Sequence, residues 1–582
     1  NTIINSISTR LFRTGELFMA VTKTHKVVDH IVETLYKYGV RHVFGIPGDA
    51  INDLMDAIRR HGKVEFIQVR HEETGAFAAS AQAKLTGKLA VCVGTAGGGA
   101  IHLLNGLYDA KLDHAPVLAI TGQLPRSEIG NHSHQEINST ALFSDVAVFN
   151  QTLFASDSAP EIIQQACNSA LIEKGVAHIA LPADVATEQV EANIRCHPVA
   201  GTETGNTKPL ASTLNNALSL IEQAEKVVVL AGIGAISARQ QLLTLLKKCN
   251  APFIRSLKAK VLLPDEHEYS LGGLGLLGTR PSLEAIENCD LLIMLGTDFP
   301  YKEYYPKNAK VIQVDKDIRH IGRRCPVDVS IVGEVSEVLD QLVVDLAQKD
   351  NDSFLTECRH QKMKWSREQG KKENLQDTPI KPQLLARSVG ELANKDAIFL
   401  CDTGTVTAWV ARHLPVTEQQ LFTLSGNLAT MAFSMAGAIG AQLKFPERQV
   451  IALIGDGGFS MLMQDFITAV NRKLPIKVII FNNAKLGLIQ LEQESSGYPD
   501  YKTSLKNPDF AEFARLCGGK GWSVSRPEQL VDALKEAFTS TDACVLDVHV
   551  DPDELVMPPK LELSQAVNYS IAKAKEFLNS ND

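Results

Sequence analysis

Two short polar segments each follow an apolar run of strand character in the last third of the chain. Gly455-Asp456-Gly457 comes directly after residues 450–454, and Asn482-Asn483 comes directly after residues 477–481. Because the carboxyl ends of parallel strands meet at one edge of an open sheet, a carboxylate and an amide should converge there. Their oxygens are hard donors suited to Mg²⁺, which takes its remaining positions from phosphate oxygens and water. The spacing therefore predicts a diphosphate site bridged by magnesium.

The glycines of the first segment favour the same ligand. Gly455, Gly457 and Gly458 let the backbone approach a phosphate, and a helix expected from about Phe459 directs its N-terminus at the same place, near Ser460. Each motif alone is more often an ordinary turn or strand end, since short motifs match by chance. Two such motifs at adjacent strand ends are stronger evidence for a site.

A second cluster of ionisable residues, His71-Glu72-Glu73, follows an expected strand over 65–70. A helix-forming run of small residues over 75–85 comes next. Carboxylates at a helix N-terminus are stabilised by the helix dipole, which is the simplest interpretation of this cluster. The residues alone leave any further role open.

Short apolar runs rich in β-branched residues alternate with helical segments along the chain. This alternation is typical of parallel sheets covered on both faces, so the predicted fold class is α/β with three doubly wound parallel-sheet domains. Polar or charged stretches at 196–212 and about 349–379 divide the domains. The predicted limits are an N-terminal extension 1–18, a first domain 19–195, a central domain 208–348, a third domain 379–552 and a C-terminal tail 553–582.

The first and third domains share a layout that the central domain lacks. Residues 88–122 and 448–483 both read as a buried strand, a glycine-rich turn, a helix and a second strand entered through a proline. A repeated order of elements indicates two related domains, although units of this kind resemble one another in many α/β proteins.

Composition excludes several classes of protein. The 582 residues, 45% hydrophobic and 21% charged, indicate a globular chain of about three or four domains rather than one core. The formal net charge of -9 gives no electrostatic sign of nucleic-acid binding, which usually shows as a basic face. Ten cysteines without a Cys-x-x-Cys pair argue against disulfides or structural zinc and favour a reducing cytoplasm. No apolar run reaches the roughly 18 residues of a membrane-spanning helix, and residues 1–18 lack the apolar stretch of a secretory signal.

The paired motifs resemble the signature of thiamine diphosphate enzymes, in which Gly-Asp-Gly is followed by Asn-Asn about 25 to 30 residues later. The resemblance implies that Asp456 and Asn483 bind Mg²⁺ through their side chains and Lys485 through its backbone carbonyl. Arg-His-Glu-Glu is similar to the form seen in pyruvate oxidases and acetolactate synthases, which implies that Glu72 bonds the pyrimidine ring nitrogen of the cofactor. In that family these two half-sites come from different chains, so a homodimer or homotetramer is expected.

Two further segments resemble parts of the same cofactor site. Met431 matches the bulky residue that wedges thiamine diphosphate into a bent form, although a methionine is more often a core residue. Gly404 and Thr405, in a segment that begins at Asp402 and ends a strand, are expected to help hold the diphosphate.

The central domain resembles the FAD-binding domain of pyruvate oxidases and acetolactate synthases. A strand leads into a turn with Gly232 and Gly234, which alone is weak evidence for a nucleotide. The alternative is a nucleotide-like domain that has lost its ligand, as in thiamine-dependent decarboxylases. The other candidate FAD ligands, which carry the resemblance, are Gly275, Thr297, Phe299 and Asp315.

The segment after Asn483 distinguishes the branches of the family. Glu492 stands where acetolactate synthases typically carry tryptophan and pyruvate oxidases carry glutamate, while Ile489 would pack beside the thiazolium ring. A carboxylate beside the reacting carbon can manage protons during electron transfer to FAD. Glu492 therefore favours oxidation.

Three segments depart from the family pattern. His134-Gln135 stands in place of Phe-Gln beside the expected substrate pocket. Gly97-Gly98-Gly99 stands in place of Gly-Pro-Gly, and Lys260-Val261 in place of Lys-Gly near the expected flavin. A histidine at position 134 can bond pyruvate or phosphate, so the substrate and the electron acceptor stay open.

The resemblance implies oxidative decarboxylation of pyruvate or a related 2-oxo acid with thiamine diphosphate, Mg²⁺ and FAD. The products would be carbon dioxide and acetate or acetyl phosphate, and the electrons would pass to quinone or oxygen. Acetolactate synthase activity is the alternative, and a non-catalytic nucleotide-binding protein is a remote one.

The tail also resembles that of quinone-linked pyruvate oxidases, from Pro558-Pro559 onward. Apolar residues at helical spacing allow contact with a membrane surface, although such a stripe more often packs on its own protein. The expected location is therefore cytoplasmic, with peripheral contact at the inner face of the membrane as an option. The stripe consists of Val567, Ile571, Ala574 and Leu578.

Overall fold

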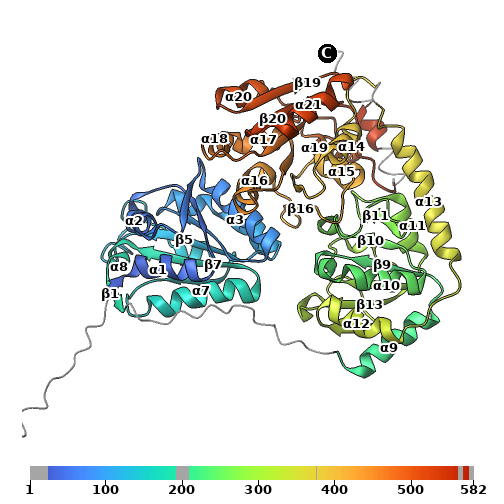
Figure 1. Cartoon of the computed structure of the whole chain (residues 1–582), viewed down its shortest axis with the longest axis horizontal. Coiled ribbons are helices and arrows are strands. Elements are labelled where there is room, and N and C mark those ends of the chain that lie inside the picture. Colours follow the sequence, from blue (N-terminus) through green and yellow to red (C-terminus); the bar gives the residue numbers. More distant parts are fainter. Residues whose placement is uncertain (1–23, 192–208, 375–376, 561–567, 574, 576–582) are drawn as a thin grey trace, which may run out of the picture.

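A computed structural model of the chain describes residues 24–191, 209–374, 377–560, 568–573 and 575. These residues form three domains, each with a six-stranded parallel sheet flanked by helices, which confirms the predicted α/β class. In Figure 1 the first domain (blue to cyan) and the central domain (green to yellow) lie below the third (orange to red). The extension 1–18, most of the stretch 196–212 and three members of the tail stripe (Val567, Ala574 and Leu578) lie outside the described residues.

The first domain is built on a sheet of strand order β3-β2-β4-β5-β7-β6, and a short antiparallel pair, β1 with β8, accompanies it. Its strands are β1 (Thr24–Lys26), β2 (His42–Gly45), β3 (Glu65–Gln68), β4 (Ala90–Gly94), β5 (Val117–Gln123), β6 (Ala147–Thr152), β7 (Val176–Pro182) and β8 (Gln189–Glu191). Its helices are α1 (Val27–Lys37), η1 (Asp49–Ile51), α2 (Asn52–His61), α3 (Glu72–Thr86), α4 (Gly98–His102), α5 (Leu104–Leu112), α6 (Ser139–Leu142), α7 (Ala159–Glu173) and α8 (Ala183–Ala186).

The central domain is built on a sheet of order β11-β10-β9-β12-β13-β14. Its strands are β9 (Val227–Ala231), β10 (Phe253–Arg255), β11 (Ser270–Gly273), β12 (Leu291–Leu295), β13 (Lys310–Asp315) and β14 (Val329–Val332). Its helices are α9 (Ala211–Gln223), η2 (Ile233–Ala238), α10 (Arg239–Cys249), η3 (Leu257–Ala259), α11 (Arg280–Asn288), η4 (Lys302–Tyr304), η5 (Ile318–His320) and α12 (Val335–Asp345), and α13 (Ser353–Gly370) leads on to the third domain.

The third domain is built on a sheet of order β16-β15-β17-β18-β20-β19. Its strands are β15 (Ile398–Cys401), β16 (Leu421–Leu424), β17 (Val450–Gly455), β18 (Lys477–Asn482), β19 (Lys520–Val524) and β20 (Cys544–His549). Its helices are α14 (Pro382–Leu392), α15 (Thr405–His413), α16 (Phe433–Lys444), α17 (Asp456–Leu462), η6 (Met463–Asp465), α18 (Phe466–Asn471), α19 (Gly487–Ser495), α20 (Phe510–Leu516) and α21 (Pro527–Thr539).

The strand orders confirm the layout shared by the first and third domains. When the six strands of each sheet are numbered along the chain, both sheets read 2-1-3-4-6-5, whereas the central sheet reads 3-2-1-4-5-6. In each sheet the direction of winding reverses beside strand 1, and ligands of open α/β sheets bind at this switch point. The switch point lies between β15 and β17 in the third domain and between β9 and β12 in the central one.

Helices α3 and α16 join the first domain to the third, and they lie side by side in Figure 1. Small residues let their backbones come close. A Cβ on Gly440 of α16 would lie only 2.1 Å from the carbonyl oxygen of Ala78 on α3, so no larger residue fits there. A Cβ on Gly437 would lie 2.9 Å from the Cβ of Ala81. The alanine-rich run that predicted a helix therefore also forms this interface.

Two helices begin three residues earlier than their sequence patterns predicted. α3 starts at Glu72 rather than at residue 75, and α17 starts at Asp456 rather than near Phe459. In α3 the ring Nδ1 of His71 accepts a hydrogen bond from the backbone N–H of Glu73 (3.3 Å), which caps the helix before the small-residue run begins. The acidic residues of both motifs thus lie in the first turn of a helix.

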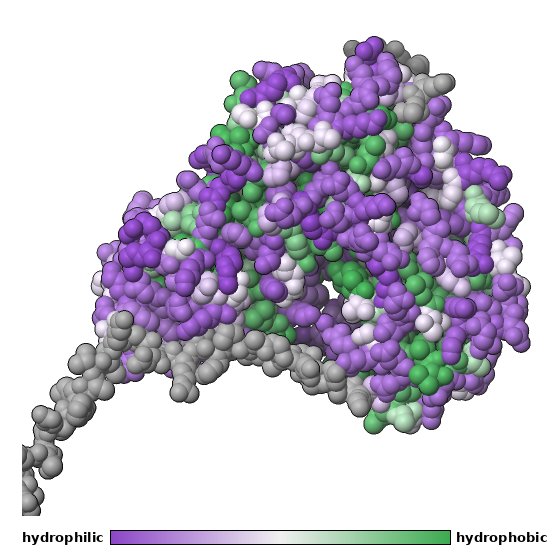
Figure 2. Space-filling view, in the orientation of Figure 1, coloured by the Kyte–Doolittle hydropathy of each residue, from purple (hydrophilic) through white to green (hydrophobic). Residues whose placement is uncertain are grey.

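None of the helices in the described residues has the length and apolar character needed to cross a membrane. Figure 2 shows a largely hydrophilic face that is hollowed where the three domains meet, with hydrophobic residues around the hollow.

Candidate active site

The two motifs of the third domain meet at one edge of its sheet. β17 and β18 are adjacent and parallel, with Gly455 beside Phe481, so their ends place Asp456 and Asn483 next to each other. Asp456 is only 1% exposed, and burial raises the pKa of its carboxyl. A buried carboxylate without a nearby cation is costly, so this position favours occupation by a metal ion.

An asparagine missed by the sequence analysis supports Asp456. Asn507 donates its side-chain amide to Oδ2 of Asp456 (2.6 Å) and to Oδ1 of Asn482 (3.3 Å). Backbone pairing between residues 484–486 and 503–505 brings Asn507 to this edge. No local sequence signal identifies Asn507, because only this long-range pairing places it beside the carboxylate.

Asn483 and Lys485 form a tight turn next to Asp456. The backbone N–H of Lys485 donates to Oδ1 of Asn483 (3.2 Å), while the Lys485 ammonium lies 3.3 Å from Asp553. The lysine side chain is thus held by Asp553, and its predicted contribution to a metal site is its backbone carbonyl. The Asp456 carboxylate after β17, with the Asn483 amide and the Lys485 carbonyl after the adjacent β18, is a set of oxygen donors that fits a hard divalent cation such as Mg²⁺.

Met431 reaches the glycines of the motif. A Cβ on Gly457 would lie 3.3 Å from the methyl carbon of Met431 and 3.1 Å from Cδ2 of Leu486. Ala429 and Ala432, on either side of Met431, have φ values of +57° and +70°, which are strained for alanine. The chain is therefore held in an unfavourable conformation to place this methionine at the site.

Asp402 holds that strained segment by hydrogen bonds to its backbone. Its buried carboxylate accepts hydrogen bonds from the backbone N–H groups of Ala432 (2.9 Å) and Ser434 (3.2 Å), and burial raises its pKa to about 7. A Cβ on Gly458 would lie 2.1 Å from Oδ2 of Asp402. Gly458 is therefore required for this close approach, whatever else it contacts.

The remaining candidate diphosphate residues lie around the switch point. Gly404 has a φ of +138° and caps the start of α15, whose first residue is Thr405. A Cβ on Gly487 would lie 3.0 Å from both Cγ2 of Thr405 and Nδ2 of Asn483, so the two loops touch. Ser460 lies one turn into α17, is exposed, and donates its hydroxyl to the carbonyl of Gly457 (2.8 Å).

Helix α19 carries two of the predicted site residues, Ile489 and Glu492. Ile489 is 45% exposed and Glu492 is also exposed, one helical turn further on. Residues three apart lie on one helix face, so both side chains belong to the same outward surface. Gln490 and Glu494 are buried and hydrogen-bonded to each other (2.8 Å), so they belong to the inward face of α19.

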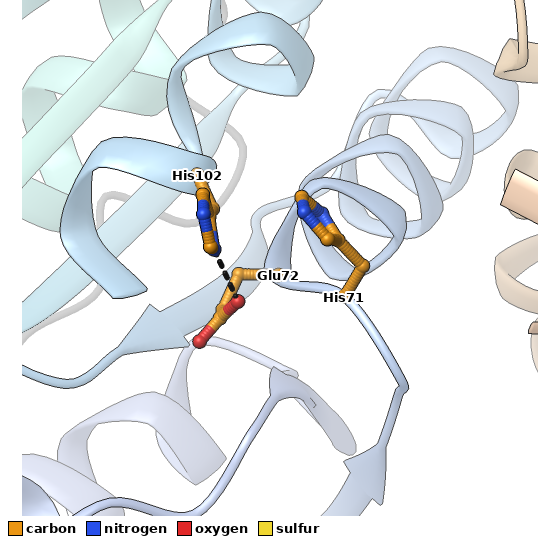
Figure 3. A group of neighbouring side chains, drawn as sticks. All are labelled: His71, Glu72 and His102. Atoms are coloured by element: carbon orange, nitrogen blue, oxygen red, sulfur yellow. Dashed lines mark hydrogen bonds and ion pairs between the residues drawn. The ribbon is translucent and has the colours of Figure 1, made fainter. Parts of the chain in front are cut away.

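Glu72 lies in the first domain with two imidazole rings beside it (Figure 3). It is 6% exposed, and its Oε2 is 2.9 Å from Nδ1 of His102 on α4. The ring of His71 stacks on that of His102 with 4.4 Å between centroids. Possible ligand atoms of these three residues lie within 4.8 Å of one another. His102, which no sequence motif identified, follows the glycine turn at 97–99 that faces Glu72.

Gln135 lies close to the same glycine turn. A Cβ on Gly97 would lie 3.1 Å from the carbonyl oxygen of Gln135, and a Cβ on Gly99 would lie 2.9 Å from Oε1 of Glu72. The glycine turn therefore connects Gln135 to Glu72. Gln135 has a strained φ of +62°, and both it and His134 are exposed.

The candidate FAD residues gather at the carboxyl ends of the central strands. The backbone N–H groups of Gly232 and Gly234 already donate to the carbonyls of Leu295 (2.9 Å) and Gly296 (3.1 Å). A Cβ on Gly232 would lie 2.4 Å from the carbonyl oxygen of Gly296 and 2.7 Å from Cβ of Thr297. These glycines therefore have a packing role at the switch point.

The other three candidates, Gly275, Phe299 and Asp315, lie at or after the carboxyl ends of β11, β12 and β13 of the same sheet. Gly275 has a φ of +93°, and a Cβ there would lie 3.1 Å from the ring of buried Phe299. Asp315, at the end of β13, accepts a hydrogen bond from the backbone N–H of Asp317 (2.9 Å) and lies 3.3 Å from the His320 ring. This hydrogen bond to Asp315 raises the pKa of His320.

Comparison with protein families matches all three domains. Residues 25–142 match the N-terminal TPP binding domain of thiamine pyrophosphate enzymes, residues 214–342 their central domain and residues 402–548 their C-terminal TPP binding domain. The boundaries of the domains at 19–195, 208–348 and 379–552 stay predictions.

Full-length relatives agree with these matches. The chain is 44% identical to a Bacillus subtilis protein named "Putative thiamine pyrophosphate-containing protein YdaP", over 94% of this chain and 96% of that protein. It is 32% identical to a pyruvate oxidase of Lactiplantibacillus plantarum, over 92% of this chain and 90% of the relative. It is also 32% identical to a "Probable acetolactate synthase large subunit" of Methanocaldococcus jannaschii, over 93% and 95%. The chain therefore belongs to the thiamine pyrophosphate enzyme family.

Proposed function

We propose that the protein is a flavoprotein that oxidatively decarboxylates pyruvate or a related 2-oxo acid. Pyruvate and water would give acetate, carbon dioxide, two electrons and two protons, and FAD would take up the electrons and protons before quinone or oxygen reoxidises it. With phosphate in place of water, acetyl phosphate would leave instead. The relatives support this class of chemistry, since they include a pyruvate oxidase and an acetolactate synthase.

The observation that carries the oxidative branch is the outward face of α19. Glu492 shares this face with Ile489, and both side chains are exposed. A tryptophan at this position would form one side of a pocket for a second 2-oxo acid. The synthase branch requires such a pocket. A carboxylate instead can accept or supply a proton at the reacting carbon while electrons leave for FAD.

The third domain would hold the diphosphate. Asp456 and Asn483 would bind Mg²⁺ through their side chains and Lys485 through its carbonyl, because these hard oxygens follow two adjacent parallel strands, β17 and β18. The fixed backbone dipoles at the start of α17 would add to the binding of phosphate. Met431 would support the bent form of the cofactor from the strained segment that Asp402 holds.

Thiamine diphosphate supplies a ring carbon that adds to a 2-oxo acid and accepts the electrons released when carbon dioxide leaves. Glu72 would hold a proton at the pyrimidine ring nitrogen, since its carboxyl is buried and faces the glycine turn. His102, 2.9 Å from Glu72, would orient that carboxyl, and His71 stacked on it would restrict the ring. Gln135, beside the same turn, would lie near the substrate.

We also propose a homodimer or homotetramer in the cytoplasm, because Glu72 and the metal site would be contributed by different protomers. Contact of the tail with the inner face of the membrane would accompany a quinone acceptor. The tail residue Ile571 is 43% exposed, which leaves apolar surface for such a contact.

Anaerobic titration with pyruvate tests the proposal. The purified holoenzyme should lose its flavin absorbance in proportion to added pyruvate and release acetate or acetyl phosphate with carbon dioxide. A flavin that stays oxidised while acetolactate accumulates would move the protein to the synthase branch. Repeating the titration with and without phosphate distinguishes the two oxidative products.

A further inference from the structure

The turn that leads into Glu72 is bound by a carboxylate from the third domain of the same chain. The backbone N–H of Arg70, two residues before Glu72, donates to Oδ1 of Asp465 (2.7 Å). Asp465 ends η6, between α17 and α18, and lies 395 residues further along the chain. The contact therefore joins the third domain to the first at the point where the chain passes from β3 to α3.

Asp465 is buried and its carboxylate is oriented. The side chain is 0% exposed, and the hydroxyl of Thr468, in the first turn of α18, donates to the same Oδ1 (2.8 Å). Burial raises the pKa of Asp465, and the hydrogen bond from the Arg70 backbone opposes this rise. A buried carboxylate is costly unless hydrogen bonds compensate it, so the donors hold it in place as much as it holds them.

A second contact fixes the other end of β3. Arg472, which follows α18, forms an ion pair with Glu65, the first residue of β3. Between the two contacts, Ile67 of β3 and Phe466 of α18 are fully buried in one hydrophobic core. β3 therefore lies along α18 in the opposite direction, with Asp465 at its carboxyl end and Arg472 at its amino end.

The position of the Glu72 carboxyl depends on this turn. Glu72 is the first residue of α3, so residues 70 and 71 set where its side chain begins. Its carboxyl already lies 2.9 Å from His102, and its expected role requires it to reach a ring nitrogen as well. A misplacement of about 1 Å in a catalytic group can cost about 100-fold in rate. A contact that fixes the backbone of this turn therefore bears directly on catalysis.

We propose that Asp465 is a positioning residue for Glu72, so that the third domain of each chain holds the turn that presents that chain's own Glu72 to the cofactor. The third domain then serves two sites of the dimer. Its Asp456 and Asn483 bind the diphosphate in one site, and its Asp465 places Glu72 in the other. This inference rests on the proposed function, in which Glu72 and the metal site of one chain belong to different sites.

Amide hydrogen exchange of the cofactor-free protein tests the contact itself. Asp465→Ala should speed exchange at Arg70 by about tenfold or more, because the amide loses a charged acceptor. Asp465→Asn, whose side-chain oxygen still accepts, should keep most of the protection. Arg472→Gln is the matched control, since it removes the other polar contact of β3 with the third domain and should leave exchange at Arg70 unchanged.

Hybrid dimers identify the site on which Asp465 acts. Asp465→Ala alone should lower kcat with pyruvate at least about tenfold. With an Asp456→Asn chain as partner, one site keeps both intact halves, so turnover should return to about half of the wild-type value. With a Glu72→Gln chain as partner, both sites are impaired, so turnover should stay below that of the Asp465→Ala parent. Asp465→Asn should remain close to the wild type.

The outcomes separate this inference from the proposed function. Recovery with the Glu72→Gln chain, recovery with neither chain, or wild-type exchange at Arg70 in Asp465→Ala would overturn the inference and leave the proposed function intact. If the protein does not oxidise pyruvate, the proposed function fails, and amide exchange still decides whether Asp465 holds the turn. If Asp465→Ala does not fold, Thr468→Val replaces it. This variant removes the hydroxyl that orients the same carboxylate oxygen and should shift both measurements in the same direction.

Discussion

The first and third domains have the same order of strands but place their chemical groups differently. The third domain uses its switch point, where Thr405 and Asp456 follow two neighbouring central strands. The first domain places Glu72 after the edge strand β3, and the turn at 97–99, which follows β4, connects this residue to the switch point between β2 and β4. There a Cβ on Gly45 would lie 2.3 Å from the carbonyl oxygen of Val93.

The sheet topology therefore determines where the loops lie, whereas individual side chains determine which of these loops forms a site. In the third domain a buried acid is held by an amide, Asn507 on Asp456. In the first domain a buried acid faces an imidazole, His102 beside Glu72. The first arrangement fits a cation bound to phosphate, and the second fits a proton shared with a heterocycle.

The largest effect is expected from removing the acid of the first domain. Glu72→Gln should lower kcat at least about 100-fold, because an amide cannot exchange a proton with the pyrimidine nitrogen. Steady-state turnover with pyruvate measures it. Glu73→Gln is the matched control, since Glu73 accepts a hydrogen bond from Asn105 (2.6 Å) and has no expected catalytic role. Unchanged turnover in Glu72→Gln would refute the role assigned to this carboxyl.

Removing the acid of the third domain should instead weaken cofactor binding. Asp456→Asn should raise the dissociation constant of thiamine diphosphate with Mg²⁺ by about 100-fold, since a metal site loses its charged ligand. Calorimetric titration of cofactor-free protein measures it. Wild-type affinity in this variant would contradict the assigned metal site.

The same substitution should stabilise the cofactor-free protein. Burial raises the pKa of Asp456, so the unfolded chain releases this proton at lower pH than the folded chain. The stability contributed by this group therefore falls as pH rises through that interval and is lowest above the folded pKa. At pH 7 Asp456→Asn should melt higher by about 2 to 4 °C, the shift given by about 1 kcal/mol. A lower melting temperature without cofactors would argue against an unfavourable buried charge.

A smaller loss is expected from the residue that supports Asp456. Asn507→Ala should weaken binding of thiamine diphosphate with Mg²⁺ by about tenfold, the usual effect of removing a partner of a metal ligand. Lys506→Ala, at the exposed neighbouring position, should bind as the wild type does. Equal affinities for all three proteins would show that Asn507 does not orient the carboxylate.

The smallest effect is expected when a side chain added to the glycine turn at 97–99 displaces the Glu72 carboxyl. A Cβ at Gly99 would lie 2.9 Å from Oε1 of Glu72, whereas one at Gly98 would have no atom within 4 Å. Gly99→Ala should therefore lower kcat about fivefold by displacing the carboxyl, consistent with the modest cost of overpacking. Gly98→Ala should leave kcat unchanged. Equal rates for the two variants would mean that the turn tolerates displacement of Glu72.

The sequence predicted the fold class and the residues whose motifs lie next to strands. The motifs at Asp456 and Asn483 were recognisable because each directly follows an apolar strand. The partners Asn507 and His102 were not, since they reach the acids only through backbone pairing at 503–505 and the glycine turn at 97–99. The direction of the Asp402 carboxylate, toward Ala432 and Ser434, also depends on tertiary packing.

The claim that one protomer's first domain works with its partner's third domain can be tested with hybrid dimers. Glu72→Gln and Asp456→Asn chains with different affinity tags are co-expressed, and protein carrying both tags is purified. A dimer of this kind has one intact site and one doubly altered site if the site is shared between protomers. The account predicts that the hybrid regains about half of the wild-type turnover although both parents are nearly inactive. A hybrid as inactive as its parents would contradict it.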